Sequence, residues 1–316
     1  MAEEKRRVGV MIMAYGGPES LADVPAYLDD IRGGRPTSQQ LIDEITERYE
    51  KIGGRSPILG LTRAQAGSIE TELNDAGDGN VYRCFVGMRH WHPYIEEVVP
   101  QMLAEEVEVV AGAVMAPHFS RMSVGAYMGK LTKALKDNGA DLPVVQVRSW
   151  KDEPDFIASI SARIRAAMAA HFPEQALNDV VVLFTAHSLP ARILESGDPY
   201  REEILTSVEL VAGEMGLTNY RFAFQSQGAS GDAWLGPTVE ETLEEFAGQG
   251  VKELLFVPIG FVCDHVEVLF DVDIEHRGQA EDLGIRLERT EMLNDDPGLA
   301  RAVASAVRVA VAEASG

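Results

Sequence analysis

Short apolar runs alternate along the chain with longer segments in which apolar residues recur every three or four positions. The short runs have the length of buried strands, and the longer segments have the period of amphipathic helices. Such alternation is typical of an α/β fold, in which parallel strands are joined by crossover helices. The expected strands are 8–14, 81–86, 107–116, 144–147, 180–185, 220–224 and 254–257, and helices are expected at 39–51, 157–171, 202–215, 239–249 and 298–314.

The pattern also indicates two domains. A chain of 316 residues is too long for one ordinary hydrophobic core and suits two. The apolar pattern is interrupted at 149–154, which predicts a boundary near residues 148–155. Two similarly built halves are suggested by a pair of histidine-bearing turns, Ala116-Pro117-His118 and Ala186-His187-Ser188, each of which follows an expected strand.

The chemically distinctive residues come directly after the expected strands. Ligands of doubly wound sheets bind outside the carboxyl ends of the strands, so these exits are the candidates for function. His187 follows the strand 180–185, and its imidazole suits a borderline metal ion such as ferrous iron, or a base near neutral pH, if a carboxylate lies beside it. His118 follows the strand 107–116 and has the same standing, and either histidine can equally be structural.

Acidic residues recur after the last expected strand, as Asp264, Glu267, Asp271 and Glu275. Steps of three, four and four would place all four carboxylates on one face of a regular helix, although a π-bulge would redirect them. Like charges at this spacing destabilise a helix. The row is either a solvated acidic face or a path that binds divalent cations or relays protons, and the spacing alone leaves both open.

Charge and cysteine content narrow the classes of function. The formal net charge of −22 disfavours nucleic acid and anionic lipid as general partners. Cys84 and Cys263 are the two cysteines, too few for a disulfide framework or for the four thiolates of an iron–sulfur cluster. The amino terminus lacks a signal-peptide pattern, and the longest apolar stretch, 254–263, is far shorter than the ~20 residues of a membrane span. We therefore expect a cytoplasmic protein without stable membrane anchoring.

Common cofactor motifs are missing from the sequence, and one basic cluster stands out against the acidic background. No GxGxxG, Walker or GxSxG motif is present, which disfavours nicotinamide, flavin, nucleotide and serine-hydrolase sites. The stretch 32–63 is locally basic and contains Arg32 and Arg48. Guanidinium groups suit carboxylate ligands, although pairing on a helix surface explains such residues equally well.

Seven segments together resemble motifs of the ferrochelatase family, in the family's order and at about its spacing. The resemblance is closest to the short, soluble bacterial members of the coproporphyrin type. The segments are Met13-Ala14-Tyr15-Gly16-Gly17-Pro18, Arg48-Tyr49-Glu50-Lys51-Ile52-Gly53-Gly54-Arg55-Ser56-Pro57, Ala116-Pro117-His118-Phe119-Ser120, Ser149-Trp150, Ala186-His187-Ser188-Leu189-Pro190, Trp234-Leu235-Gly236-Pro237 and Asp264-His265-Val266-Glu267-Val268-Leu269. One departure is Gly17, which stands where a hydroxyl residue is common in the family.

The resemblance implies two Rossmann-like, chelatase-type α/β domains, each with a parallel sheet flanked by helices, and an active-site cleft between them. We expect the domains to span 1–149 and 150–296, with the final helix, 297–316, packing back on the first. The implied reaction is insertion of Fe(II) into a porphyrin. Iron is then a substrate, and neither a tightly bound cofactor nor an iron–sulfur cluster is expected.

Residue by residue, the resemblance implies that His187 and Glu267 are the catalytic pair. It assigns metal handling to these two residues together with Asp271 and Glu275, the later members of the acidic row. Six residues match positions that line the porphyrin or hold its propionates: Tyr15, Arg32, Arg48, Tyr49, Ser56 and Tyr127.

The porphyrin itself is open to more than one interpretation. The arginine-bearing stretch 32–56 and the lack of an apolar membrane lip favour coproporphyrin III, with four propionates, over protoporphyrin IX, with two. Other hypotheses are a chelatase that delivers cobalt or nickel to a different tetrapyrrole, and a non-catalytic carrier of haem or porphyrin. We expect a monomer.

Overall fold

The computed structural model describes residues 5–228 and 233–314, and the chain divides into two compact units. The first unit comprises Met1–Glu153 together with Asn294–Gly316, and the second comprises Pro154–Leu293. The division therefore falls after Glu153, a few residues beyond the expected 149/150. Trp150 belongs to the first unit because its indole is buried there and donates to the Val114 carbonyl oxygen at 3.1 Å.

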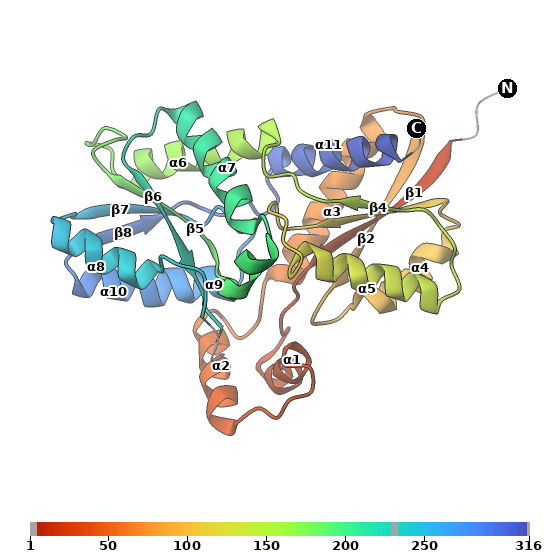
Figure 1. Ribbon diagram of the computed structural model, residues 1–316, viewed down its shortest axis with the longest axis horizontal. Coiled ribbons are helices and arrows are strands. Elements are labelled where there is room, and N and C mark those ends of the chain that lie inside the picture. Colours follow the sequence, from red (N-terminus) through yellow and green to blue (C-terminus); the bar gives the residue numbers. More distant parts are fainter. Residues whose placement is uncertain (1–4, 229–232, 315–316) are drawn as a thin grey trace. The chain divides into compact units, whose positions relative to one another are not determined.

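Four parallel strands form the sheet of the first unit, in the order β2-β1-β3-β4 (Figure 1). Their bounds are Arg6–Ala14 for β1, Asn80–Met88 for β2, Val109–Val114 for β3 and Val144–Val147 for β4. The central strands β1 and β3 are almost wholly buried, as expected for parallel strands that are covered on both faces. Their apolar runs therefore serve the core, and only the residues after each strand can meet a ligand.

Seven helices accompany this sheet among the described residues. The helices are η1 Leu21–Asp23, α1 Val24–Ile31, α2 Gln39–Lys51, α3 Ile58–Asp75, α4 Ile95–Ala104, α5 Val124–Asp137 and α11 Pro297–Glu313. Helix α4 packs beside α5, and their apolar faces meet β1 and β3 in one core cluster. Helix α11 packs on α3, β3 and β4, so the end of the chain completes the first unit. Residues 315–316 of the expected final helix lie outside the described residues.

The second unit repeats this plan with the strand order β6-β5-β7-β8, again all parallel. Its strands are β5 Val181–His187, β6 Tyr220–Gln225, β7 Glu253–Val257 and β8 Arg286–Arg289. Its helices are α6 Pro154–His171, η2 Ala191–Ser196, α7 Tyr200–Met215, α8 Val239–Gln249, α9 Val266–Leu269, the π-helix η3 Asp271–His276 and α10 Arg277–Asp282. The expectation of two Rossmann-like units with parallel sheets flanked by helices is confirmed.

The shared strand order changes the meaning of the two histidine-bearing turns. His187 ends β5, which holds the same place in its sheet as β1 holds in the first. His118 follows β3, whose counterpart is β7 rather than β5. The two turns are therefore alike in sequence but do not occupy equivalent positions.

A close approach at Gly260 joins the loop after β7 to the adjacent strand β5. The Gly260 N–H donates to the Thr185 carbonyl oxygen at 3.0 Å. A Cβ at position 260 would lie 2.5 Å from the Cβ and 2.7 Å from the Cα of Ala186, which is nearer than packed carbon atoms can come. Since Ala186 precedes His187, the lack of a side chain at Gly260 brings the loop that leads to Glu267 against the strand that ends in His187.

In the described part of the chain, every helix is too short or too polar to cross a membrane.

Replacing Gly260 by alanine should destabilise the second unit, because neither the Ala186 backbone nor its methyl group can move aside. Overpacking of this kind costs about 1–3 kcal/mol. Gly248→Ala, within α8, is the matched control, since a Cβ there meets no atom within 4 Å. That change should leave stability unaltered or raise it by up to about 1 kcal/mol. Urea unfolding of both variants checks this, and equal unfolding free energies would contradict the proposed close packing.

Candidate active site

A histidine and a carboxylate meet at the carboxyl end of the second sheet. His187 is the last residue of β5, and its Nδ1 lies 2.8 Å from Oε2 of Glu267, on the one-turn helix α9. The side chains are 32% and 31% exposed, so each presents part of its surface to solvent. The pair that sequence resemblance selected is thus brought together by the fold, although the two residues are 80 positions apart.

The electrostatics of this pair follow from its hydrogen bond. Burial alone would keep the His187 imidazole neutral, but the nearby Glu267 carboxylate and its hydrogen bond outweigh burial and raise the pKa of His187. Burial likewise opposes charge on Glu267, yet the imidazole beside it lowers the pKa of this carboxyl group. Both shifts favour the ion pair, and the charge on Asp271 adds to the rise in the His187 pKa.

Backbone anchors hold both members of the pair. The Tyr200 hydroxyl donates to the His187 carbonyl oxygen at 2.9 Å. The Gln225 amide donates to the Glu267 carbonyl oxygen at 2.9 Å, and the Thr185 hydroxyl donates to the Gln225 side-chain oxygen at 2.7 Å. Each side chain of the pair therefore extends from an anchored backbone position.

The four acids do not share one face of a regular helix, because the alternative of a π-helical turn is the one present. Asp264 lies before α9 and pairs with Arg289. Beyond α9 the chain forms a π-helix, in which the amide groups of Ile274 and Glu275 both donate to the Phe270 carbonyl oxygen, at 3.0 and 3.1 Å. A π-helix turns less per residue than an α-helix, so the expected alignment is lost.

The later acids of the row occupy different environments. Asp271 is buried and accepts a hydrogen bond from the Ser226 hydroxyl at 2.5 Å, whereas Glu275 is half-buried. Within residues 5–228 and 233–314, no three His, Cys, Asp or Glu side chains form a group that could hold a metal ion.

Sequence reasoning missed several residues that shape this site. Gln225 ends β6 and Ser226 follows it, so applying the strand-exit rule to the run 220–224 would have found both. His265 was quoted only as part of a motif; its Nδ1 is buried and makes no hydrogen bond within the described residues, and burial lowers its pKa. Trp234 places its ring edge-on to His187, with ring centroids 6.4 Å apart.

His118 proves unlike His187. Its side chain is almost fully buried, and burial, reinforced by the charge of Lys151, lowers its pKa to about 3. A histidine whose burial favours the neutral ring and that has little accessible surface is suited to packing and hydrogen bonding rather than to proton exchange. The structure therefore ranks the two histidines that the sequence left equal.

In the first unit, Gly17 lies close to three of the residues predicted to bind porphyrin, namely Tyr15, Tyr49 and Ser56. Tyr15 follows β1, is 41% exposed, and packs its ring against His90 with centroids 4.6 Å apart. A Cβ at Gly17 would lie 2.8 Å from Ser56 Oγ and 3.5 Å from the Tyr49 hydroxyl. This close approach leaves no room for a side chain at position 17, where the resemblance stated above implies a hydroxyl residue.

The other predicted porphyrin residues differ in their accessibility. Tyr49, Ser56 and Tyr127 are each buried, with Arg89 lying over the Tyr127 ring at 5.3 Å. Arg48 pairs with Glu44 one helical turn away at 3.1 Å. Arg32 donates to the Pro36 carbonyl oxygen at 3.3 Å.

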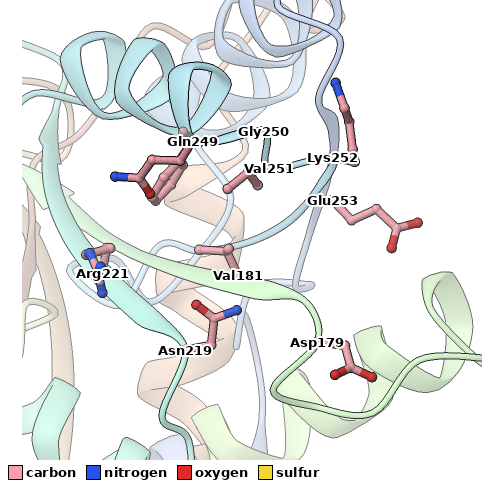
Figure 2. Close-up of a pocket in the computed structure, with 10 residues that line it drawn as sticks. Asp179, Val181, Asn219, Arg221, Gln249, Gly250, Val251, Lys252 and Glu253 are labelled. Atoms are coloured by element: carbon pink, nitrogen blue, oxygen red, sulfur yellow. The ribbon is translucent and has the colours of Figure 1, made fainter.

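A separate pocket of about 410 Å³ lies at the opposite ends of the strands in the second unit (Figure 2). Val181, at the start of β5, and Glu253, at the start of β7, line it together with Arg221 and Lys252. Its lining mixes both signs of charge and lacks the histidine–carboxylate pair. The amino ends of parallel strands are also the less common place for ligands in this type of fold.

Comparison with known proteins identifies the family. A family model described as ferrochelatase matches residues 7–311. The chain belongs to the ferrochelatase family.

Curated proteins similar to this chain are also named as ferrochelatases. The chain is 41% identical over 311 residues to a ferrochelatase from Deinococcus radiodurans, covering 98% of each chain. It is 38% identical over 311 residues to a coproporphyrin III ferrochelatase from Halalkalibacterium halodurans, covering 98% of this chain and 99% of the relative. The family predicted from seven sequence segments is thereby confirmed.

Solved structures support the fold of this ferrochelatase family member. The chain superimposes on SirB from Bacillus subtilis with Fe3+ with a TM-score of 0.61, covering 98% of both chains at 7% identity. At that identity the likeness concerns the fold alone, and it agrees with a chelatase-type arrangement of parallel sheets.

In this ferrochelatase family member, the pKa of His187 should lie above the ordinary ~6.5 and fall when Glu267 is replaced by glutamine. Without the carboxylate, burial acts alone and favours the neutral ring, so the protonated form is lost at a lower pH. Titration of the histidine ring signals by NMR measures this directly in the metal-free protein. Glu275→Gln is the control, because the charge of Glu275 does not contribute to the shift at His187. An unchanged His187 pKa in the Glu267 variant would contradict the ion pair.

Proposed function

We propose that this chain inserts Fe(II) into coproporphyrin III, with His187 and Glu267 as the catalytic pair. The observation that carries the proposal is the 2.8 Å contact between these residues at the strand ends of a ferrochelatase-family protein. Iron is a substrate in this proposal, not a resident cofactor. Cytoplasmic location and a monomeric state, both expected from the sequence, belong to the same proposal.

The chemistry requires two pyrrole protons to leave the porphyrin and water to leave the iron. In the neutral ring, with the Nδ1–H of His187 donating to Glu267, Nε2 is the nitrogen that remains to accept a proton or to bind iron. Glu267 stabilises the imidazolium that forms when the ring takes up a proton, as its effect on the His187 pKa indicates. Asp271 and Glu275 then act further along the same segment, in receiving protons or delivering the metal ion.

The first unit is assigned to the porphyrin. Arg32 and Arg48 would bind propionate groups, since a guanidinium donates two parallel hydrogen bonds to a carboxylate. One partner of Arg48 is the carboxylate of Glu44 one turn away, and such surface pairs are worth little, so a propionate can compete with it. Tyr15 is exposed enough to meet the ring directly. Because Tyr49, Ser56 and Tyr127 are buried, they would support the residues that contact the porphyrin rather than contact it themselves.

Support for coproporphyrin over protoporphyrin comes from charge. A protein with a net charge of −22 needs local cations to hold a polyanionic ligand, and the basic stretch 32–63 supplies them. Several curated relatives similar to this chain, including those of Halalkalibacterium halodurans and Bacillus subtilis, are named coproporphyrin III ferrochelatases. Others, such as that of Deinococcus radiodurans, are named ferrochelatase alone.

His187→Ala should lower iron insertion by about 10²- to 10⁴-fold, the usual contribution of a positioned acid–base group, while leaving porphyrin binding largely intact. Anaerobic insertion followed by absorbance gives the first quantity, and quenching of porphyrin fluorescence gives the second. His171→Ala is the control, because His171 is an exposed surface histidine of the same unit. Retained turnover in the His187 variant would refute the assignment of this residue.

Coproporphyrin III should be turned over with a kcat/KM at least about tenfold above that of protoporphyrin IX, because one charged hydrogen bond to an added propionate is worth roughly this factor. Parallel anaerobic assays with both porphyrins test the preference, and Arg48→Gln should narrow it. Faster turnover of protoporphyrin would overturn the substrate while keeping the reaction. Tight porphyrin binding without insertion of iron into either would favour a carrier or a chelatase for another metal.

A further inference from the structure

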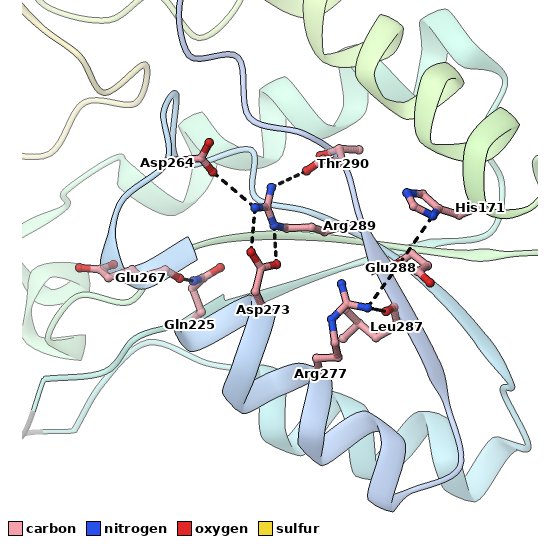
Figure 3. A network of polar contacts seen from close by, with 10 residues as sticks. All are labelled: His171, Gln225, Asp264, Glu267, Asp273, Arg277, Leu287, Glu288, Arg289 and Thr290. Atoms are coloured by element: carbon pink, nitrogen blue, oxygen red, sulfur yellow. Dashed lines mark hydrogen bonds and ion pairs between the residues drawn. The ribbon is translucent and has the colours of Figure 1, made fainter. Parts of the chain in front are cut away.

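Arg289 joins two acids that flank Glu267 in the sequence (Figure 3). Its Nε and Nη2 donate to the two carboxylate oxygens of Asp273, at 2.6 and 2.8 Å. Nη2 also reaches Oδ1 of Asp264 at 3.4 Å, and Nη1 donates to the Thr290 carbonyl oxygen at 2.9 Å. One side chain at the end of β8 therefore ties together both ends of the segment 264–273.

This segment needs anchors from outside because its own secondary structure is weak. Helix α9, which carries Glu267, is a single turn of four residues, and the π-helix η3 follows it after one residue. Short helices are marginal without tertiary contacts, and π-helices are rare and found mostly at functional sites. The conformation of Glu267 is therefore determined by what holds the segment in place.

The anchors come from two directions. On one side, Gln225 and Ser226, at the end of β6, hold the Glu267 carbonyl oxygen and the Asp271 carboxylate. On the other side, Arg289 holds Asp264 and Asp273 from strand β8. If Arg289 were removed, the segment would lose its polar anchor on the β8 side and keep those on the β6 side.

Charge adds to the geometric argument. The Arg289 side chain is 14% exposed, and burial opposes its charge, yet its hydrogen bonds to Asp273 and the charge of Asp264 more than compensate and raise its pKa. Two-pronged pairs between guanidinium and carboxylate groups are stronger and more directional than ordinary ion pairs. Without the guanidinium, Asp264 and Asp273 would repel each other and the neighbouring carboxylates of Glu267 and Asp271.

We propose that Arg289 is a positioning residue for iron insertion. Through Asp264 and Asp273 it holds Glu267 within hydrogen-bonding distance of His187. The inference rests on the proposed roles of His187 and Glu267. It gives β8 a function beyond closing the sheet, because the strand delivers the guanidinium to the segment that carries the catalytic carboxylate.

Arg277 provides a matched control in the same unit. It begins helix α10, and its Nη1 donates to the Leu287 carbonyl oxygen at 2.8 Å and pairs with Glu288 at 3.3 Å (Figure 3). Both partners lie on β8, like Arg289 itself, but neither belongs to the segment 264–273. Arg277→Gln thus removes a comparable structural link without touching the anchors of Glu267.

The experiment compares Arg289→Gln, Arg289→Lys and Arg277→Gln in the full chain. The measurements are kcat and KM for ferrous iron, the Kd for coproporphyrin by fluorescence quenching, and Tm. Arg289→Gln should lower kcat/KM for iron by about 10- to 100-fold, the usual effect of losing a residue that orients a metal-handling group. Lysine keeps the charge but cannot make the paired hydrogen bonds, so it should restore only part of the loss. The porphyrin Kd should stay within about twofold, as should all constants of the Arg277 variant.

Equal iron kinetics in Arg289→Gln and Arg277→Gln would overturn the proposal, because the arginine would then contribute stability alone. If the Arg289 variants do not fold, Asp264→Asn tests the positioning role instead, since it removes one carboxylate partner of Arg289 from a partly exposed position. A selective loss of kcat/KM for iron in that variant supports the positioning role of Arg289, and parent-like kinetics refute it. His187→Ala is assayed in parallel. If that variant stays active, the proposed catalytic pair fails; if it is inactive while Arg289→Gln is unaffected, only the positioning role fails.

Discussion

The hydrogen bond between His187 and Glu267 depends on two neighbouring strands and on the loop that leaves one of them. β5 ends at the histidine, while the chain beyond β7 must turn back over β5 before its helix can present the carboxylate. Gly260 permits that turn, because any side chain there would collide with Ala186. Tyr200 and Gln225 then donate hydrogen bonds to the backbone carbonyl oxygens of His187 and Glu267. These contacts help to hold the two side chains 2.8 Å apart.

The interior of the fold could be predicted from the sequence because parallel strands covered on both faces must be apolar. The expected run 8–14 falls within β1, and the run 254–257 falls within β7, both central strands. β8 escaped notice because its sequence is Arg-Leu-Glu-Arg, in which Leu287 is the buried residue. A single buried residue gives no apolar run, so only the pairing with β7 reveals this strand.

Prediction of the site was limited because sequence spacing does not show which distant residues come into contact. Motif resemblance selected His187 and Glu267, but no periodicity could place residues so far apart in sequence within hydrogen-bonding distance. The direction of the acidic side chains was left open for a different reason. A π-helix forms when tertiary contacts favour a wider turn, and the contacts of Asp271 with Ser226 and of Asp273 with Arg289 are long-range ones that a local pattern does not contain.

The two sheets share one strand order, so the side chains at equivalent strand ends can be compared directly. The positions that correspond by topology are the ends of β1 and β5, where the chain places Tyr15 directly after one strand and His187 at the end of the other. One backbone plan thus carries a phenol in one half and an imidazole in the other, an oxygen donor and a nitrogen donor of different affinity for metals. The difference between the two units at these positions therefore comes from a few side chains at equivalent strand ends, since the strand order itself is the same.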